Sequence, residues 1–263
     1  MSKRLVQEQF GANAAHYIDS PSHARGASLA RLVELVGPQP HWHVLDVATG
    51  TGHTALAFAP RVAAVVGLDL TPEMLVAATN LAAERGVENI SFIPGDVEDL
   101  PFGDGVFDLV TCRIAAHHFS DVGRFLAEAT RVLRPDGVLA VVDNIVPDSR
   151  LHGKKAAQQR EAGEYVNTFE KLRDPSHMRY LSFEEWLDAL AAAGLSVEAI
   201  ETLDKRLTFE TWAARHTPEM RTRLRVLLMR APVVAAEFLD PHTDTGVTTF
   251  RLREGLFVAR KPK

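Results

Sequence analysis

The stretch from residue 44 to residue 59, VLDVATGTGHTALAFA, constrains the fold more than any other part of this 263-residue chain. Residues 44–47 predict a buried strand, and residues 54–59 predict the first turns of a helix. Between them, Gly50 permits a tight turn, and Gly52 lets backbone N–H groups approach a ligand without a Cβ atom in the way. A strand, a glycine turn and a helix in this order predict a nucleotide-binding corner of an α/β fold.

Two kinds of ligand fit this corner. Residues 50–55, GTGHTA, satisfy the dinucleotide pattern G-x-G-x-x-[GA], so NAD or NADP is one candidate. Asp46 favours another, because a carboxylate beside the helix N-terminus would repel a pyrophosphate placed there. S-adenosylmethionine (SAM) has no phosphate, and both its ammonium and its sulfonium are cationic. An acidic residue beside the glycine turn therefore suits SAM.

Residues 46–52, DVATGTG, resemble the D-x-G-x-G-x-G motif of the class I SAM-dependent methyltransferases, with Ala48 in place of the first glycine. The chain is most similar to the ubiquinone/menaquinone-biosynthesis type and its small-molecule relatives, over roughly residues 8–145. The resemblance implies an α/β, doubly wound (Rossmann-like) sheet of seven strands with an antiparallel last strand and helical lid insertions. It also implies SAM as cofactor and S-adenosylhomocysteine (SAH) as product, with the turn at the methionine half. The cofactor-binding residues that it indicates here are Asp46, Ala48, Gly50, Thr51 and Gly52.

A second acidic residue ends the next predicted strand, residues 61–69. Asp69 follows Gly50 by 19 residues, which is near the spacing expected for a carboxylate that accepts hydrogen bonds from two ribose hydroxyls. Both SAM and NAD require this acceptor, so Asp69 does not distinguish them. Leu70 and Met74 follow it and are candidates for packing on the adenine ring, although lone apolar residues are more often core.

Residues 95–102, GDVEDLPF, follow the third predicted strand, residues 90–94. In the methyltransferase family this stretch places an aspartate against the adenine amino group and the next N–H group against a ring nitrogen. The matching residues are Asp96 and Val97, preceded by Gly95. The exocyclic amine of adenine is a donor and needs an acceptor, whereas a NAD enzyme does not call for this acid. The alternative for Asp96 is a turn residue that binds its own backbone.

Residues 113–119, RIAAHHF, follow the fourth predicted strand and should face the ligand crevice of a doubly wound sheet. Arg113 is a candidate for contact with the cofactor or a substrate anion. His117 and His118 are candidate proton acceptors for a hydroxyl or thiol nucleophile, because imidazole titrates near neutrality. A structural role for either histidine is the alternative. No third ligand with motif spacing accompanies them, so no metal site is predicted.

Further segments predict the periphery of a single domain that spans residues 1–263. Residues 1–40 form a helical lid, in which Phe10 and Tyr17 either close over the cofactor, as the resemblance implies, or simply pack. Residues 41–146 form the cofactor-binding core. Residues 147–180 form a polar helical insertion that covers the crevice, and residues 181–263 complete the sheet and the substrate cover. There a strand at residues 196–202 pairs with an antiparallel strand at 248–259 that is interrupted at residues 253–255.

Composition narrows the functional class. A net charge of −5 argues against a nucleic-acid partner, and one cysteine, Cys112, excludes an internal disulfide. No apolar run approaches a membrane span, so a cytoplasmic enzyme with a small-molecule substrate is expected. Nucleic-acid and protein N-methyltransferases of the family that the chain resembles often carry an N-P-P-Y motif after the fourth strand, so the resemblance, with this motif absent, argues against methylation of nucleobase or glutamine amines. The alternatives are an NAD(P)-dependent oxidoreductase and a SAM-binding protein without transferase activity; the acceptor atom and the oligomeric state, a homodimer included, stay open.

Overall fold

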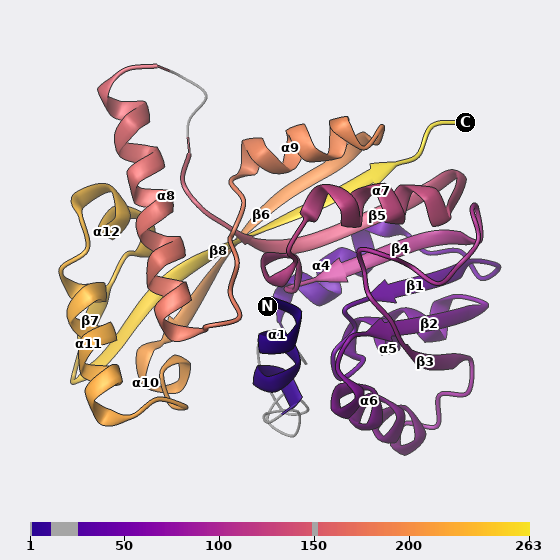
Figure 1. The fold of residues 1–263 in the computed structure, drawn as a ribbon, viewed down its shortest axis with the longest axis horizontal. Coiled ribbons are helices and arrows are strands. Elements are labelled where there is room, and N and C mark those ends of the chain that lie inside the picture. Colours follow the sequence, from indigo (N-terminus) through magenta and orange to yellow (C-terminus); the bar gives the residue numbers. More distant parts are fainter. Residues whose placement is uncertain (1, 12–25, 149–151) are drawn as a thin grey trace.

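The computed structural model describes residues 2–11, 26–148 and 152–263, and Tyr17 lies outside these ranges. A mixed sheet forms its centre, with the strand order β3-β2-β1-β4-β5-β8-β6 and a short strand β7 paired to β8 (Figure 1). The first five strands in this order are mutually parallel, and β8 is antiparallel to both β5 and β6. The strands are β1 (His43–Val47), β2 (Ala64–Asp69), β3 (Ile90–Pro94), β4 (Phe107–Arg113), β5 (Leu133–Ile145), β6 (Ser196–Thr208), β7 (His242–Asp244) and β8 (Val247–Arg260).

Helices cover both faces of the sheet, as the doubly wound prediction requires. Apolar residues of α4 and α5 pack on one face, and those of α7 and α9 pack on the other. The helices are α1 (Ser2–Gly11), α4 (Ala27–Val36), α5 (His53–Phe58), α6 (Pro72–Glu84), α7 (Val122–Val132), α8 (Lys154–Arg173), α9 (Phe183–Ala192), α10 (Phe209–Trp212), α11 (Pro218–Met229) and α12 (Val233–Leu239), with 3-10 turns η1 (Ala59–Arg61) and η2 (Ala116–His118).

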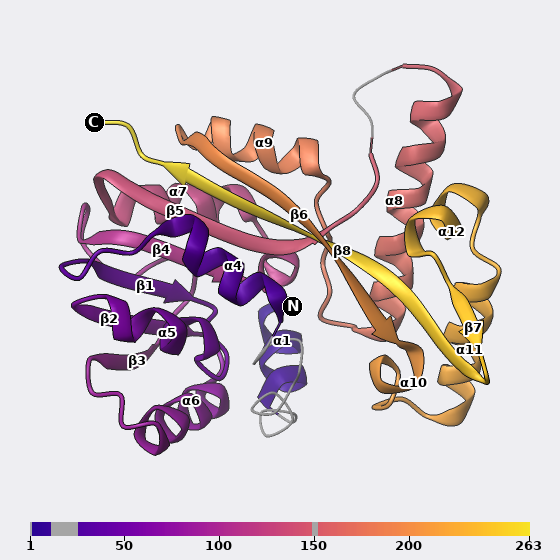
Figure 2. The same cartoon turned by 180° about the vertical axis from the view of Figure 1, so that it is seen from behind.

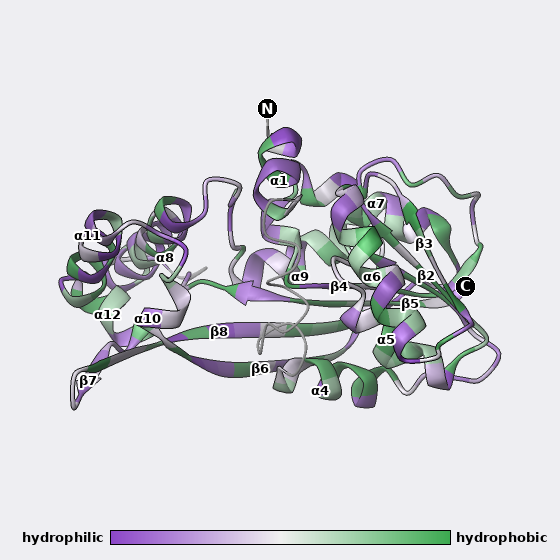
Figure 3. Ribbon diagram, turned by 90° about the horizontal axis from the view of Figure 1, so that it is seen from below, coloured by the Kyte–Doolittle hydropathy of each residue, from purple (hydrophilic) through white to green (hydrophobic). Residues whose placement is uncertain are grey.

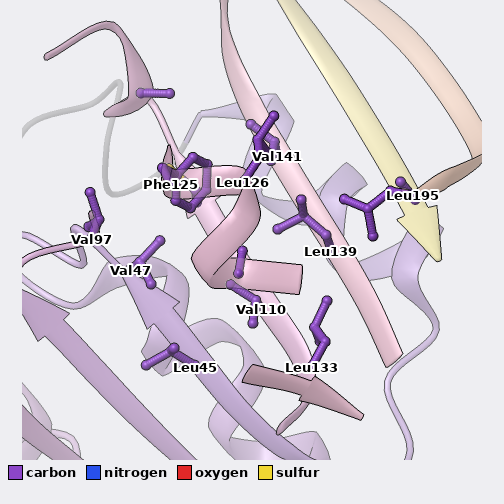
Figure 4. Packing of buried hydrophobic residues seen from close by; sticks show 14 of the residues in the cluster. Leu45, Val47, Val97, Val110, Phe125, Leu126, Leu133, Leu139, Val141 and Leu195 are labelled. Carbon is purple, nitrogen blue, oxygen red and sulfur yellow. The ribbon is translucent and has the colours of Figure 1, made fainter. Parts of the chain in front are cut away.

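In the core, alternate side chains of β1 pack on opposite faces of the sheet. Leu45 and Val47 of β1 join Phe125 and Leu126 of α7 in one fully buried cluster (Figure 4). Val44 joins the cluster on the opposite face. Because side chains alternate along a strand, a strand buried on both faces is apolar nearly throughout. Asp46 is the exception in β1, at 1% exposure, and its burial requires polar partners.

The last two long strands differ from the prediction. β8 runs unbroken through residues 253–255, where charged residues and a glycine predicted an interruption. Glu254 pairs with Leu203 of β6 in the ladder, and its carboxylate lies 3.0 Å from Nζ of Lys205. A Cβ atom on Gly255 would lie 2.7 Å from the Phe257 ring, so the glycine makes room for that ring rather than for a bend. β6 likewise extends to Thr208, six residues beyond the prediction.

The extended ends of β6 and β8 carry a second apolar cluster away from the parallel strands. There α8, α10, α11 and α12 gather around the outer halves of these strands (Figures 1 and 2). In Figure 3, β6 and β8 run from the parallel strands to the group of helices α8, α10, α11 and α12. The insertion helix α8 belongs to this second cluster through Val166 and Phe169. The segment after α8 returns to the end of β5, where the Val146 amide donates to the Leu181 carbonyl. A capping box formed by Ser182 and Glu185 starts α9.

Candidate active site

Residues at the carboxyl ends of the parallel strands and residues of α1 line a pocket. Figure 1 shows α1 beside these strand ends. Asp46, Asp69 and Asp96, each within two residues of the end of its strand, all line the pocket. Since β1, β2 and β3 are neighbours and parallel, their carboxyl ends meet at one edge, so residues distant in sequence converge there. With Glu98, the pocket holds four carboxylates against two cationic side chains, Lys3 and Arg113. A cationic ligand is therefore favoured over an anionic one.

The glycine turn between β1 and α5 has the conformation that its sequence predicts. Gly50 has φ +54° and Gly52 has φ +82°, a left-handed region that glycine adopts at little cost. Ala48, where the motif has a glycine, also has positive φ, +50°. Ala48, Gly50 and Thr51 line the pocket, whereas Gly52 lies outside the lining; a Cβ atom on Gly52 would lie 3.0 Å from the Phe92 ring.

Asp46 anchors this turn. Its Oδ1 accepts a hydrogen bond from the Thr111 hydroxyl at 2.6 Å, and its Oδ2 accepts one from the Thr49 hydroxyl at 2.6 Å. The Ala55 amide of α5 donates to the same Oδ2 at 3.2 Å. Burial raises the pKa of Asp46 to about 6, although these hydrogen bonds act in the opposite direction. Asp46 thus links β1, β4 and the first turn of α5, in addition to lining the pocket.

Asp69 joins the ends of β2 and the glycine turn. Its Oδ2 accepts a hydrogen bond from the Gly50 amide at 2.8 Å, and its Oδ1 accepts one from the Thr71 amide at 2.9 Å. Each oxygen keeps a second lone pair, so two further donors can be accepted. Burial raises the pKa of Asp69, against the effect of the backbone amides. The carboxylate is therefore fixed in position with one acceptor site per oxygen still to be used.

Asp96 begins the loop after β3 and meets α1. Its Oδ1 accepts from the Glu98 amide at 3.0 Å, and its Oδ2 lies 2.5 Å from Nζ of Lys3. The same ammonium lies 2.8 Å from Glu98. Val97 lines the pocket beside them, whereas Gly95 does not; a Cβ atom on Gly95 would lie 2.5 Å from the Leu68 side chain. Gly95 therefore serves close packing behind the loop.

The apolar side of the pocket comes from α1, α6 and the end of β2. Leu70 and Met74 line it as the sequence predicts, and Met74 is 2% exposed. Gln7 of α1 donates to the Leu70 carbonyl at 2.9 Å, which holds α1 over this wall. Apolar side chains facing carboxylates across a pocket suit a ligand with a flat heterocycle and polar edges.

Arg113 ends β4 and lines the pocket from the opposite side. Its Nε donates to the Thr54 hydroxyl at 3.0 Å, and its side chain is buried. Burial lowers the pKa of Arg113, while the charges of Glu254 and Asp46 act to raise it. Ile114 follows with φ +54°, a strained conformation for a β-branched residue, and this turns the chain into η2.

The two adjacent histidines of η2 have different environments. His117 does not line the pocket; its Nδ1 lies 2.7 Å from Oδ1 of Asp143, and its amide donates to Oδ2 at 2.8 Å. Its carbonyl accepts the amides of Met178 and Arg179. Burial lowers the pKa of His117 to about 3 and raises that of Asp143 to about 7. The structure therefore separates the predicted pair, and His117 joins η2 to β5 and to the segment after α8.

His118 is half-buried and lines the pocket. Its ring meets the Phe10 ring of α1 edge-on, with centroids 4.9 Å apart. Its Nδ1 lies 3.2 Å from Oγ of Ser176, a residue of the segment after α8. Burial lowers the pKa of His118 to about 3, so its imidazole is neutral near pH 7.

Sequence reasoning missed several residues of this site. Lys3 and Glu98 lie too far apart in sequence to be paired by spacing, and Ser176 is 58 positions from His118. His53, directly after the glycine turn, begins α5, is buried and lines the pocket. Within residues 2–11, 26–148 and 152–263, no three His, Cys, Asp or Glu side chains are grouped to hold a metal ion.

Comparison with known proteins decides between the two ligand classes. Residues 45–141 match the family model described as "Methyltransferase domain". The chain is 39% identical over 206 residues to the uncharacterized methyltransferase YcgJ of Bacillus subtilis, covering 78% of each. The crystal structure of YcgJ superposes with a TM-score of 0.82 and 34% identity, covering 90% of this chain and 98% of YcgJ. This chain belongs to the class I SAM-dependent methyltransferases.

A further relative of the methyltransferase is the demethylmenaquinone methyltransferase of Thermus thermophilus, 42% identical over 115 residues, which are 43% of this chain and 52% of that one. The enzyme class, the cofactor SAM and the Rossmann-like fold inferred from the sequence are thus confirmed, and the oxidoreductase alternative is not supported. In the described part of the methyltransferase, each helix is too short or too polar to cross a bilayer.

Proposed function

We propose that this methyltransferase binds SAM in the pocket beside α1 and transfers its methyl group to a small organic acceptor. The observation that carries the proposal is the convergence of Asp46, Asp69 and Asp96 on one pocket beside the glycine turn. The negative lining matches a cationic nucleoside, and the apolar wall of Leu70 and Met74 matches a heterocycle. The residues present therefore fit the cofactor.

Different pocket residues would bind different parts of SAM. Asp69 would accept the two ribose hydroxyls on the lone pairs that its backbone bonds leave open. Asp96 would accept the adenine amine, and the Val97 amide would donate to a ring nitrogen. The Gly50–Gly52 turn would hold the methionine half. When bound, SAM supplies a methyl group already activated by its sulfonium, so the protein mainly positions the acceptor and excludes water.

A small acceptor is supported by the sequence after β4 and by one relative. Residues 113–119 carry two histidines and no N-P-P-Y motif. The demethylmenaquinone methyltransferase of Thermus thermophilus has, by its name, a demethylmenaquinone as its acceptor. We infer an organic acceptor that reaches the pocket beside His118.

Calorimetry of the full chain with SAM, SAH and NADH tests the cofactor half of this proposal. We expect binding of SAM and SAH at micromolar concentrations and no heat with NADH; the reverse result would contradict it. Incubation with methyl-labelled SAM and a metabolite extract tests the transfer. Label in a small product supports the proposal, whereas tight SAM binding without any labelled product would indicate a SAM-binding protein that lacks transferase activity.

A further inference from the structure

A chain of hydrogen bonds runs from the pocket into the insertion. Nδ1 of His118 lies 3.2 Å from Oγ of Ser176, and that hydroxyl donates to Oδ1 of Asp174 at 2.6 Å. The Ser176 amide donates to the same Oδ1 at 3.0 Å, and Arg215 lies 3.0 Å from Oδ2. Ser176 and Asp174 are both buried, at 1% and 4% exposure. The geometry of these hydrogen bonds is thus fixed by side chains that are shielded from water.

The direction of these hydrogen bonds sets the tautomer of His118. A serine hydroxyl has one proton, and an ionised carboxylate can only accept. Burial alone would raise the pKa of Asp174, but the hydrogen bonds from Ser176 and the guanidinium of Arg215, together with His118 when that ring is protonated, outweigh burial and hold this pKa below its ordinary value. Ser176 therefore gives its proton to Asp174 and accepts one from His118. The proton of neutral His118 must then lie on Nδ1, so the lone pair of the ring is on Nε2.

We propose that His118 is the catalytic base that removes the proton of the acceptor, and that Ser176 and Asp174 are positioning residues that hold its Nδ1–H tautomer. This inference rests on the proposed function and assigns a role within its site. His118 lines the pocket, whereas His117 is turned to Asp143 and does not. The insertion thus contributes to the active site through two side chains that the sequence pattern could not connect to it.

The proposed step balances in atoms and charge. An electron pair of the acceptor, a lone pair on oxygen or a π pair of the ring, forms the bond to the methyl carbon, and the carbon–sulfur bond breaks with its electrons on sulfur. The proton of the acceptor passes to Nε2 of His118. The positive charge that was on the sulfonium is then on the imidazolium, where the Ser176–Asp174 chain stabilises it. No oxidant, reductant or further reactant is needed.

A base held at the pocket also indicates the acceptor, because His118 lines the pocket and its Nδ1 is engaged by Ser176. An oxygen or an electron-rich ring carbon that gains a methyl group becomes a strongly acidic cation until it loses its proton, so a positioned base serves this transfer. A neutral amine needs no base to accept the methyl group, and the methylated amine is a weak acid that can keep its proton. A positioned base therefore favours a hydroxyl, or a carbon of a hydroxylated ring, over an amine as the acceptor.

Nitrogen NMR of the ¹⁵N-histidine-labelled, SAH-saturated protein tests the tautomer directly. The His118 signals are assigned by their loss in His118→Gln. We expect a neutral ring with its proton on Nδ1 between pH 6 and 8. Ser176→Ala should shift the population toward the Nε2–H form, while SAH affinity stays within about two-fold. Thr168→Ala removes an exposed hydroxyl from the same insertion and should leave the signals unchanged.

Two results would overturn the proposal. A proton on Nε2 in the wild-type protein would leave no lone pair for the acceptor, and an unchanged tautomer in folded Ser176→Ala would remove the positioning role.

The acceptor class is tested with ¹³C-methyl SAM and a metabolite extract, where the carbon shift distinguishes methyl on oxygen, carbon and nitrogen. A product methylated on oxygen or carbon supports the inferred acceptor class, and a product methylated on nitrogen contradicts it. We expect His118→Gln to slow this transfer by about 10²-fold or more.

These outcomes are separable from a failure of the proposed function. If SAH does not bind to the wild-type protein, the cofactor assignment itself fails. If SAH binds and the tautomer is wrong, only the role of His118 fails.

Discussion

The ammonium of Lys3 in α1 lies 2.5 Å from Oδ2 of Asp96, the carboxylate assigned to the adenine amine. The Lys3 and Asp96 side chains are 44% and 28% exposed, so water weakens this ion pair. The lysine thus places a donor at the carboxylate assigned to the adenine amine and competes with the adenine for it.

Removing the Lys3 ammonium should strengthen binding of the cofactor. We expect Lys3→Met to tighten SAH binding by up to about five-fold, because a partly exposed ion pair contributes at most about 1 kcal/mol. Arg4→Met is a matched control, since the Arg4 guanidinium bonds to Glu8 on the exposed side of the same helix. Isothermal titration of both variants measures the effect. Weaker SAH binding by Lys3→Met alone would show instead that the lysine joins the loaded site.

Two glycines allow the backbone cost of the turn to be separated from its role in binding. Gly50 and Gly37 have φ +54° and +58°, and neither has an atom within 4 Å of where a Cβ would lie. Replacement of either by alanine should therefore lower the free energy of unfolding by about 1–2 kcal/mol. Only Gly50 lines the pocket, so only Gly50→Ala should also weaken SAH binding. Denaturant titration and calorimetry give the two quantities, and equal SAH affinities would contradict the assignment of the turn.

His177 provides a test of the pH dependence of folding. Its ring is buried, and burial, followed by the charges at His117 and His118, lowers its pKa to about 2. The unfolded chain takes up this proton below pH 6.5 and the folded chain does not, so stability present above pH 6.5 is lost as the pH falls. The loss has a limiting slope of about 1.4 kcal/mol per pH unit.

His177→Gln removes this contribution. We expect the stability difference between the wild type and the variant to shrink as the pH falls from 7.5 to 5, measured by denaturant titration at each pH. Asp46 and Asp143, whose pKa values burial raises, act in the opposite direction in both proteins and cancel in the comparison. A difference that is constant or grows on acidification would show that His177 is protonated in the folded chain.

The parallel half of the sheet was predictable because its signals are local. β3 matches the predicted residues 90–94, and β1, β2 and β4 end at or within one residue of the predicted position. The positions of Asp69 and Asp96 followed from these strand ends. The resemblance to the methyltransferases added the cofactor, and the comparisons confirmed it.

The parts of the fold and of the site that the sequence did not predict depend on contacts between residues that are distant in the sequence. The unbroken course of β8 through Glu254 requires Lys205 of β6, and nothing near residue 254 signals that partner. The separation of His117 from His118 is set by Asp143 and Ser176, from two other segments. The helix α12 and the three-residue strand β7 were not predicted, since short elements around a second cluster have weak periodicity.

The central claim is that carboxylates from neighbouring strands together bind the cofactor. Titration of SAH into Asp69→Asn and Asp96→Asn, each verified as folded, tests it most directly, with Asp108→Asn as a control carboxylate that pairs with Arg134 outside the pocket. We expect each pocket variant to lose about 10- to 100-fold in affinity and the control to stay within about two-fold. Unchanged affinity in both pocket variants would contradict the claim.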